Sequence, residues 1–156
     1  MISGMQVETG TLVSADWPAL WPMLQDMGTT GGEASVRDRF DELLECPEWA
    51  LLGARAGGVL VGYAAAQDRG PHLRAGDEHR TARLHDLYVL PARRHHGAGR
   101  ALMDAVVAWA RGRVRYLEWQ AHQQRAAPFY QRLGYHGEPC PQPDHPTFEI
   151  DLSQPG

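Results

Sequence analysis

Hydrophobic and polar positions along the chain repeat with two periods, one typical of strands and one typical of helices. In the N-terminal half these patterns predict a strand over 5–13, helices over 14–27 and 36–45, and strands over 49–55 and 59–67. The last two strands are joined by Ala56-Gly57-Gly58, a tight hairpin signal. Ser35 followed by Asp38 resembles a capping box, so the second helix is expected to begin just after Ser35.

In the C-terminal half the patterns predict a strand over 83–90, a helix over 97–111, a strand over 114–121, a helix over 125–133 and a last strand over 147–152. Because proline is tolerated only in the first turn of a helix, Pro128 requires the short helix to begin near Arg125. Gly134 is expected to end that helix in the left-handed conformation. The long polar stretch 68–82 is typical of a binding loop or lid. With one further C-terminal strand whose bounds are not assigned, the predicted order is β-α-α-β-β-β-α-β-α-β-β, which indicates a mixed α/β sandwich.

Length and composition restrict the class of protein. The 156 residues are enough for one domain, 1–156, and a hydrophobic fraction of 43% with a net charge of -4 excludes intrinsic disorder. Apolar runs such as Tyr63–Ala66 are far shorter than the ~20 residues of a membrane span, and residues 1–4 have neither the basic nor the apolar region expected of a signal peptide. We therefore expect a cytoplasmic protein whose Cys46 and Cys140 stay reduced. Its acidic balance argues against nucleic-acid binding.

The most informative segment leads from a strand through a basic, glycine-bearing turn into a helix. There the first backbone N–H groups of the helix and the side chains of Arg93, Arg94 and Arg100 are expected to converge as an anion site. The alternative is a turn that uses glycine only for its geometry. The chain has no lysine, which excludes a nucleoside-triphosphate loop, and Leu102 stands where a dinucleotide fingerprint needs a small residue.

Two motifs carry a family resemblance. Arg94-x-x-Gly97-x-Gly99, preceded by Asp86-Leu87-Tyr88-Val89-x-Pro91, resembles the acyl-CoA signature of the GNAT superfamily of N-acetyltransferases. Ala126-x-x-Phe129-Tyr130-x-x-Leu133-Gly134-Tyr135 is similar to that family's C-terminal helix motif. Gln123 departs from the family pattern, because it stands where the family usually has asparagine.

The resemblance implies a mostly antiparallel central sheet with flanking helices and acetyl-CoA as cosubstrate. It also implies transfer of the acetyl group to a primary amine, on a small molecule or a peptide, by direct attack in a ternary complex. A catalytically silent acyl-CoA-binding module of the same fold is the alternative. The sequence is compatible with a homodimer. By resemblance, the residues that bind the cosubstrate are Leu87, Tyr88, Val89, Arg94, His95, His96, Gly97, Ala98, Gly99, Arg100, Gln123, Ala126 and Phe129.

Acetyl transfer to an amine needs a base, an oxyanion donor and an acid. By resemblance, backbone N–H groups near 87–89 bind the oxyanion and Tyr130 protonates the thiolate; a packed core tyrosine is the alternative for Tyr130. His85 and Asp86 are the candidate bases, besides a water relay. In an alternating strand only one of them can face the thioester, and the resemblance favours His85. Either can instead be structural.

The acceptor itself is left open by the sequence. The eight histidines show no zinc spacing, so no metal is expected. The loops at 28–33 and 68–82 carry no known acceptor motif, and Trp17 or Trp21 is a candidate for lining an acceptor pocket. Acidic residues in or beside these loops predict a cationic acceptor, namely Glu33, Asp38, Asp77 and Glu78.

Overall fold

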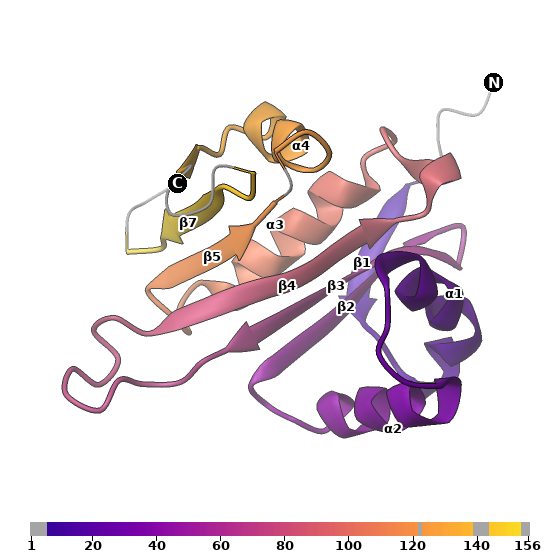
Figure 1. Cartoon of the computed structure of the whole chain (residues 1–156), viewed down its shortest axis with the longest axis horizontal. Helices are drawn as coiled ribbons and strands as arrows, with labels where there is room; N and C mark the ends of the chain where they lie inside the picture. Colours follow the sequence, from indigo (N-terminus) through magenta and orange to yellow (C-terminus); the bar gives the residue numbers. More distant parts are fainter. Residues whose placement is uncertain (1–5, 122, 139–143, 154–156) are drawn as a thin grey trace. The chain divides into compact units, whose positions relative to one another are not determined.

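The computed structural model describes residues 6–121, 123–138 and 144–153 (Figure 1). Its strands and helices are β1 (Val7–Thr11), α1 (Trp17–Met27), α2 (Glu33–Leu44), β2 (Trp49–Ala56), β3 (Val59–Asp68), β4 (Thr81–Val89), α3 (Ala98–Ala110), β5 (Tyr116–Gln120), α4 (Ala127–Arg132), β6 (Gly137–Glu138) and β7 (Thr147–Asp151). This order confirms the predicted one. Met5, at the predicted start of the first strand, and Cys140 lie outside the described residues.

The strands form one sheet in the order β1-β2-β3-β4-β5-β7-β6. β1 with β2, β2 with β3, β5 with β7 and β6 with β7 pair antiparallel. β4 and β5 pair in parallel, over Thr81–Arg83 and Tyr116–Glu118. The prediction of a mixed, mostly antiparallel sheet with flanking helices is therefore confirmed. No helix among the described residues is long and apolar enough to cross a membrane.

The chain groups into two compact units, which divide within β4. The first contains residues up to Gln67 together with His85–Trp109, and the second contains Asp68–Leu84 with the residues from Ala110 onward. Each unit is described by itself. The expectation of one domain over 1–156 stays a prediction.

In the first unit, helices cover both faces of the strands. Tyr63 on β3 packs in a buried cluster with side chains of α1 and α2, among them Leu20 and Phe40. The neighbouring Gly62 faces the other way: a Cβ there would lie 3.2 Å from Leu102 of α3 and 2.5 Å from the Tyr88 carbonyl oxygen. α3 therefore packs against the opposite face from α1 and α2. Gly62 is required because β4 approaches too closely for any side chain.

α2 begins earlier than the sequence predicts. It starts at Glu33 after an extended Gly32, without a side-chain cap, so Ser35 lies inside the helix and the predicted capping box is wrong. The Glu33 carboxylate accepts a hydrogen bond of 2.9 Å from the Trp17 indole Nε1. A carboxylate is also favoured in the first turn by the helix dipole. This pairing of Glu33 explains the earlier start.

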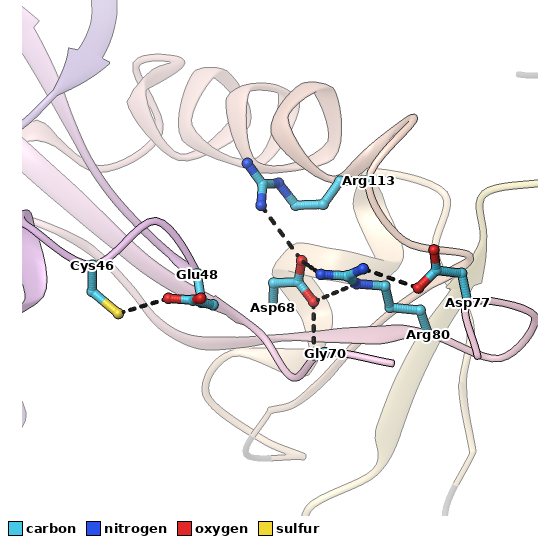
Figure 2. A network of polar contacts seen from close by, with 7 residues as sticks. All are labelled: Cys46, Glu48, Asp68, Gly70, Asp77, Arg80 and Arg113. Atoms are coloured by element: carbon cyan, nitrogen blue, oxygen red, sulfur yellow. Dashed lines mark hydrogen bonds and ion pairs between the residues drawn. The ribbon is translucent and has the colours of Figure 1, made fainter. Parts of the chain in front are cut away.

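The second unit contains a buried ionic cluster at the end of β3 (Figure 2). Asp68, whose side chain is fully buried, accepts hydrogen bonds of 2.9 Å from Nε and Nη2 of Arg80, and Arg113 Nη1 lies 3.4 Å from the same carboxylate. The backbone N–H of Gly70 donates a further bond of 2.8 Å, and Arg80 also pairs with Asp77 at 3.0 Å. These contacts join the two ends of the stretch 68–80, so this part of the predicted loop is held in a defined conformation by ion pairs and hydrogen bonds.

Candidate active site

β4 of the first unit places His85 and Asp86 on one face of the sheet. His85 stacks on Trp49 with ring centroids 5.1 Å apart, and its Nε2 lies 2.9 Å from Gln67 Oε1. Asp86 accepts a hydrogen bond of 3.0 Å from the Tyr63 hydroxyl. Trp49 is paired with Gln67, and Tyr63 lies four residues before Gln67 on β3, so all three share a face.

Two consecutive side chains on one face mean that the strand alternation is interrupted between them, as at a β-bulge. The expectation that only one of His85 and Asp86 can face the site is therefore wrong. Both line the same cavity. The choice of His85 over Asp86 as the base no longer follows from alternation, and the role of each stays a prediction.

Tyr63 fixes the orientation of the Asp86 carboxylate. It is 2% exposed, and burial, with the nearby Asp86 charge as a second cause, raises the pKa of the Tyr63 hydroxyl well above its ordinary value. The hydroxyl therefore stays protonated and remains a donor. Sequence reasoning missed Tyr63, although a signal existed: a tyrosine in an apolar strand run must find a partner for its hydroxyl.

Backbone N–H groups of Leu87 and Val89 point away from β3. The N–H of Leu90 donates to the Val61 carbonyl at 2.9 Å, and the Tyr88 carbonyl faces Gly62. Since backbone groups alternate sides along a strand, those of Leu87 and Val89 point toward the other edge. The described pairing with β5 covers only Thr81–Arg83, so these two N–H groups lie beyond it. They are suitably directed for the predicted oxyanion role.

The predicted anion site lies at the turn after β4 and the start of α3, and its role stays a prediction. Residues 91–97 are exposed, and α3 begins at Ala98. The first backbone N–H groups of an α-helix have no acceptor within the helix. His95 and Gly97 have φ values of 68° and 96°, in the left-handed region, which folds the turn back on itself. Arg94 Nε donates 2.9 Å to the Val89 carbonyl, and its guanidinium lies 5.6 Å from the Tyr88 ring centroid.

Tyr88 connects this strand to α1. Its hydroxyl donates a bond of 2.6 Å to the Asp26 carboxylate, and burial, followed by that bond, raises the pKa of Tyr88. The predicted binding residues Leu87–Val89 and Arg94–Arg100 thus belong to one continuous stretch of the first unit. Asp26, at the end of α1, is a supporting residue that no sequence motif indicates.

A cavity of about 410 Å³ opens beside Asp86 in the first unit. α1, α2 and the strands β2 and β3 contribute mostly apolar side chains, and the turn at Gly28–Thr30 lines it as well. Trp49 lines this cavity, whereas Trp17 is buried and stacks on Trp21 at 5.5 Å. Of the four acids that predicted a cationic acceptor, none lines the cavity; Glu33 is paired with Trp17, and Asp77 and Glu78 belong to the second unit.

The second unit holds the remaining predicted residues. Tyr130 on α4 is 6% exposed and packs on Trp119, Phe129 and Phe148, with ring centroids 5.0–5.5 Å away. Burial raises the pKa of its hydroxyl. Ala126 caps α4, and its carbonyl accepts from the backbone N–H of Phe129 at 3.0 Å. Gln123 is exposed, and its backbone N–H donates to the Asp144 carbonyl at 2.9 Å.

Cys46 lies between α2 and β2, outside both motifs. Its thiol donates a hydrogen bond of 3.0 Å to Glu48, and that bond raises the pKa of the thiol (Figure 2).

Comparisons with known proteins agree with this fold and these motifs. A family model described as the Acetyltransferase (GNAT) family matches residues 17–135. The N-alpha-acetyltransferase RimI of Mycobacterium tuberculosis is 34% identical over 96 residues, which are 62% of this chain and 58% of that protein. An uncharacterized N-acetyltransferase of the same organism, Rv2669, is 40% identical over 101 residues, which are 62% of this chain and 59% of that protein. The matched region thus spans little more than half the length of these relatives.

A solved structure shows the same fold. The PaiA N-acetyltransferase of Thermoplasma acidophilum, in complex with coenzyme A, superposes with a TM-score of 0.70 at 17% identity, covering 94% of this chain and 99% of that one. Because the family model covers most of the chain, the chain belongs to the GNAT acetyltransferase family.

Proposed function

We propose that the protein transfers an acetyl group from acetyl-CoA to a primary amine by direct attack in a ternary complex. One observation carries the proposal: a single stretch of the first unit, 85–100, presents two candidate bases at a cavity, two directed N–H groups and an anion-binding helix start. A thioester with a phosphate-bearing tail needs the last two features, and an amine acceptor needs the first. The name of the RimI relative, an N-alpha-acetyltransferase, supports an amine as acceptor.

The residues of the anion site fit a pyrophosphate. The first N–H groups of α3, which lack acceptors within the helix, two left-handed backbone positions and exposed Arg93, Arg94 and Arg100 supply donors and positive charge. Arg94 Nε donates to the Val89 carbonyl, and the terminal nitrogens of Arg94 are the proposed donors to phosphate. Acetyl-CoA supplies the acetyl group there as a thioester.

In the proposed mechanism Asp86 takes the proton from the acceptor ammonium, directly or through water, and His85 is the alternative base. The neutral amine nitrogen then forms a bond to the carbonyl carbon, and the N–H groups of Leu87 and Val89 stabilise the oxyanion. As the carbon–sulfur bond breaks, Tyr130 donates a proton to the departing thiolate; the attacking nitrogen loses its second proton to solvent, from which Tyr130 is reprotonated. The products are the acetylated amide and coenzyme A.

Calorimetry with acetyl-CoA tests the first requirement. We expect binding with a Kd in the range of about 10 µM or tighter, and a loss of at least about tenfold for Gly99→Leu, whose side chain obstructs approach to the backbone. Ala108→Leu, on the exposed face of the same helix, is the matched control and should bind normally. Absence of binding by the wild-type chain rejects the proposal. Binding with no coenzyme A release across a broad amine panel supports the silent module instead.

A further inference from the structure

We infer that the acceptor is a primary amine carried on one bulky apolar group, an arylalkyl or branched alkyl chain, and not a polycation. The inference rests on the proposed function, because it takes the cavity beside Asp86 as the acceptor site. It goes further by assigning the chemistry of the part of the acceptor that does not react.

The cavity has the size and the lining of a site for an apolar ligand. Its volume of about 410 Å³ lies within the ~300–1,000 Å³ typical of small-molecule pockets. The wall opposite the strands is formed mainly by apolar side chains from α1 and α2, including Leu24, Met27, Phe40 and Leu43. Such a wall gains free energy by burying an apolar group, and it leaves the hydroxyl groups of a sugar without partners.

The charged residues that line the cavity can pair with one ammonium group. Among the lining residues, all of which the structure describes, Asp86 is the one carboxylate. Arg39 is the one permanent cation, and its Nη2 lies 3.5 Å from the Thr30 carbonyl oxygen at the rim. A second ammonium on the acceptor therefore finds no opposite charge in the lining and is repelled by Arg39. Polyamines and aminoglycosides are disfavoured for this reason.

The first experiment measures coenzyme A release with a panel of primary amines. We expect kcat/KM for 2-phenylethylamine and 3-methylbutylamine to exceed that for ethylamine by at least about tenfold, because each added methylene in an apolar pocket is worth roughly 10- to 200-fold. Spermidine and neamine should fall below the apolar amines. A short peptide beginning with phenylalanine belongs in the panel, because faster turnover of the peptide assigns the same chemistry to a protein N-terminus.

The second experiment narrows the cavity. Ala65→Leu adds three carbon atoms to a lining residue two positions from Tyr63 on β3. The ratio of kcat/KM for 2-phenylethylamine to that for ethylamine should fall at least about tenfold. Leu24→Phe narrows the same cavity from α1 and replaces Ala65→Leu in the test if Ala65→Leu does not fold. Ala108→Leu, an addition of the same size outside the cavity, should leave the ratio unchanged.

A binding measurement separates failure of the inference from failure of the proposed function. Calorimetric titration of 2-phenylethylamine into the protein saturated with coenzyme A reports occupancy of the cavity without turnover. Binding that weakens in Ala65→Leu supports the apolar cavity even if no amine is acetylated, in which case only the proposed function fails. Turnover that favours spermidine, neamine or ethylamine, or a ratio unaltered in both narrowing variants, overturns the inference. So does the absence of apolar-amine binding.

Discussion

Asp68 and Asp86 are two aspartates in strands of similar length, but their surroundings differ. The surroundings of Asp68 suit a role in stability, and those of Asp86 suit a role in the proposed reaction. Asp68 is fully buried and receives hydrogen bonds from Arg80 and from a backbone N–H, with Arg113 close by. Asp86 is half-buried, accepts a bond from the neutral Tyr63 hydroxyl and lines a cavity. A carboxylate compensated by two cations is held in place and unavailable to a ligand. A carboxylate oriented by a neutral donor keeps its charge for an ammonium group.

The largest expected effect comes from Asp86→Asn, which preserves shape and removes the proposed base. kcat should fall by roughly 10³-fold, about 4 kcal/mol of transition-state stabilisation, with the melting temperature nearly unchanged. Steady-state kinetics beside a thermal melt provide the measurement, and His85→Gln is the parallel variant. If only His85→Gln shows the loss, the two roles are exchanged.

Asp68→Asn should have the opposite signature. It leaves Arg80 and Arg113 without their buried partner, and we expect a loss of roughly 3 kcal/mol in the free energy of unfolding, while the folded fraction keeps its turnover. Denaturant titration and an activity assay at low temperature measure the two quantities. If the free energy of unfolding of the variant equals that of the wild type, the ionic cluster does not contribute to stability.

The same cluster predicts a dependence of stability on pH. Burial alone would raise the pKa of Asp68, but the hydrogen bonds from Arg80, Gly70 and Arg113 outweigh it and lower that pKa below its ordinary value. The stabilisation is therefore present above the pKa of the unfolded chain, about 4, and is lost as the pH falls through the lower folded value. Melts between pH 7 and pH 3 should show a smaller decline for Asp68→Asn than for the wild type.

Tyr130→Phe tests the proposed acid with a smaller expected loss. A thiol leaves tolerably as a thiolate, so kcat should fall by roughly 10²-fold, about 2.7 kcal/mol, while acetyl-CoA affinity stays unchanged. The aromatic packing on Trp119 and Phe148 is kept, because only the hydroxyl is removed. Reduced stability with normal kcat assigns Tyr130 to the core alone.

The smallest effect is expected for Tyr63→Phe. Removing the hydroxyl frees the Asp86 carboxylate to rotate, so kcat should fall by about tenfold, roughly 1.4 kcal/mol. KM for the cosubstrate should not move, since the Tyr63 hydroxyl that is removed donates to Asp86 and not to a residue of the predicted anion site. A double-mutant cycle with Asp86→Asn tests this explanation. When Tyr63→Phe is added to Asp86→Asn, kcat should fall no further, because the effect of Tyr63 acts through Asp86.

The order of elements was predictable because it follows from local periodicity and turn chemistry. Gly134, expected to be left-handed, has φ of 97°. The start of α2 was not predictable, because the bond from Trp17 to Glu33 joins residues far apart in sequence. The two-residue strand β6 has a place in the predicted order, but it is too short for any period to assign its residues.

At the candidate site, the glycine-bearing turn between β4 and α3 could be predicted because it follows from local sequence; that it binds an anion stays a prediction. The sequence could not predict that His85 and Asp86 lie on one face of the sheet. A β-bulge depends on the pairing with neighbouring strands and does not alter the spacing of polar residues along the sequence. The same holds for Tyr63 and Asp26, which reach the site through tertiary contacts. Their roles stay predictions until the variants are measured.

The bond between Cys46 and Glu48 has a consequence for how the protein withstands oxidants and labelling reagents. Alkylation and oxidation proceed through the thiolate, and a thiol whose pKa is raised by a neighbouring carboxylate holds little of that form at neutral pH. Cys46 should therefore react slowly with maleimides and peroxide. A cysteine introduced on the exposed face of α3, at Ala108, is then the faster-reacting position for a fluorescent reporter.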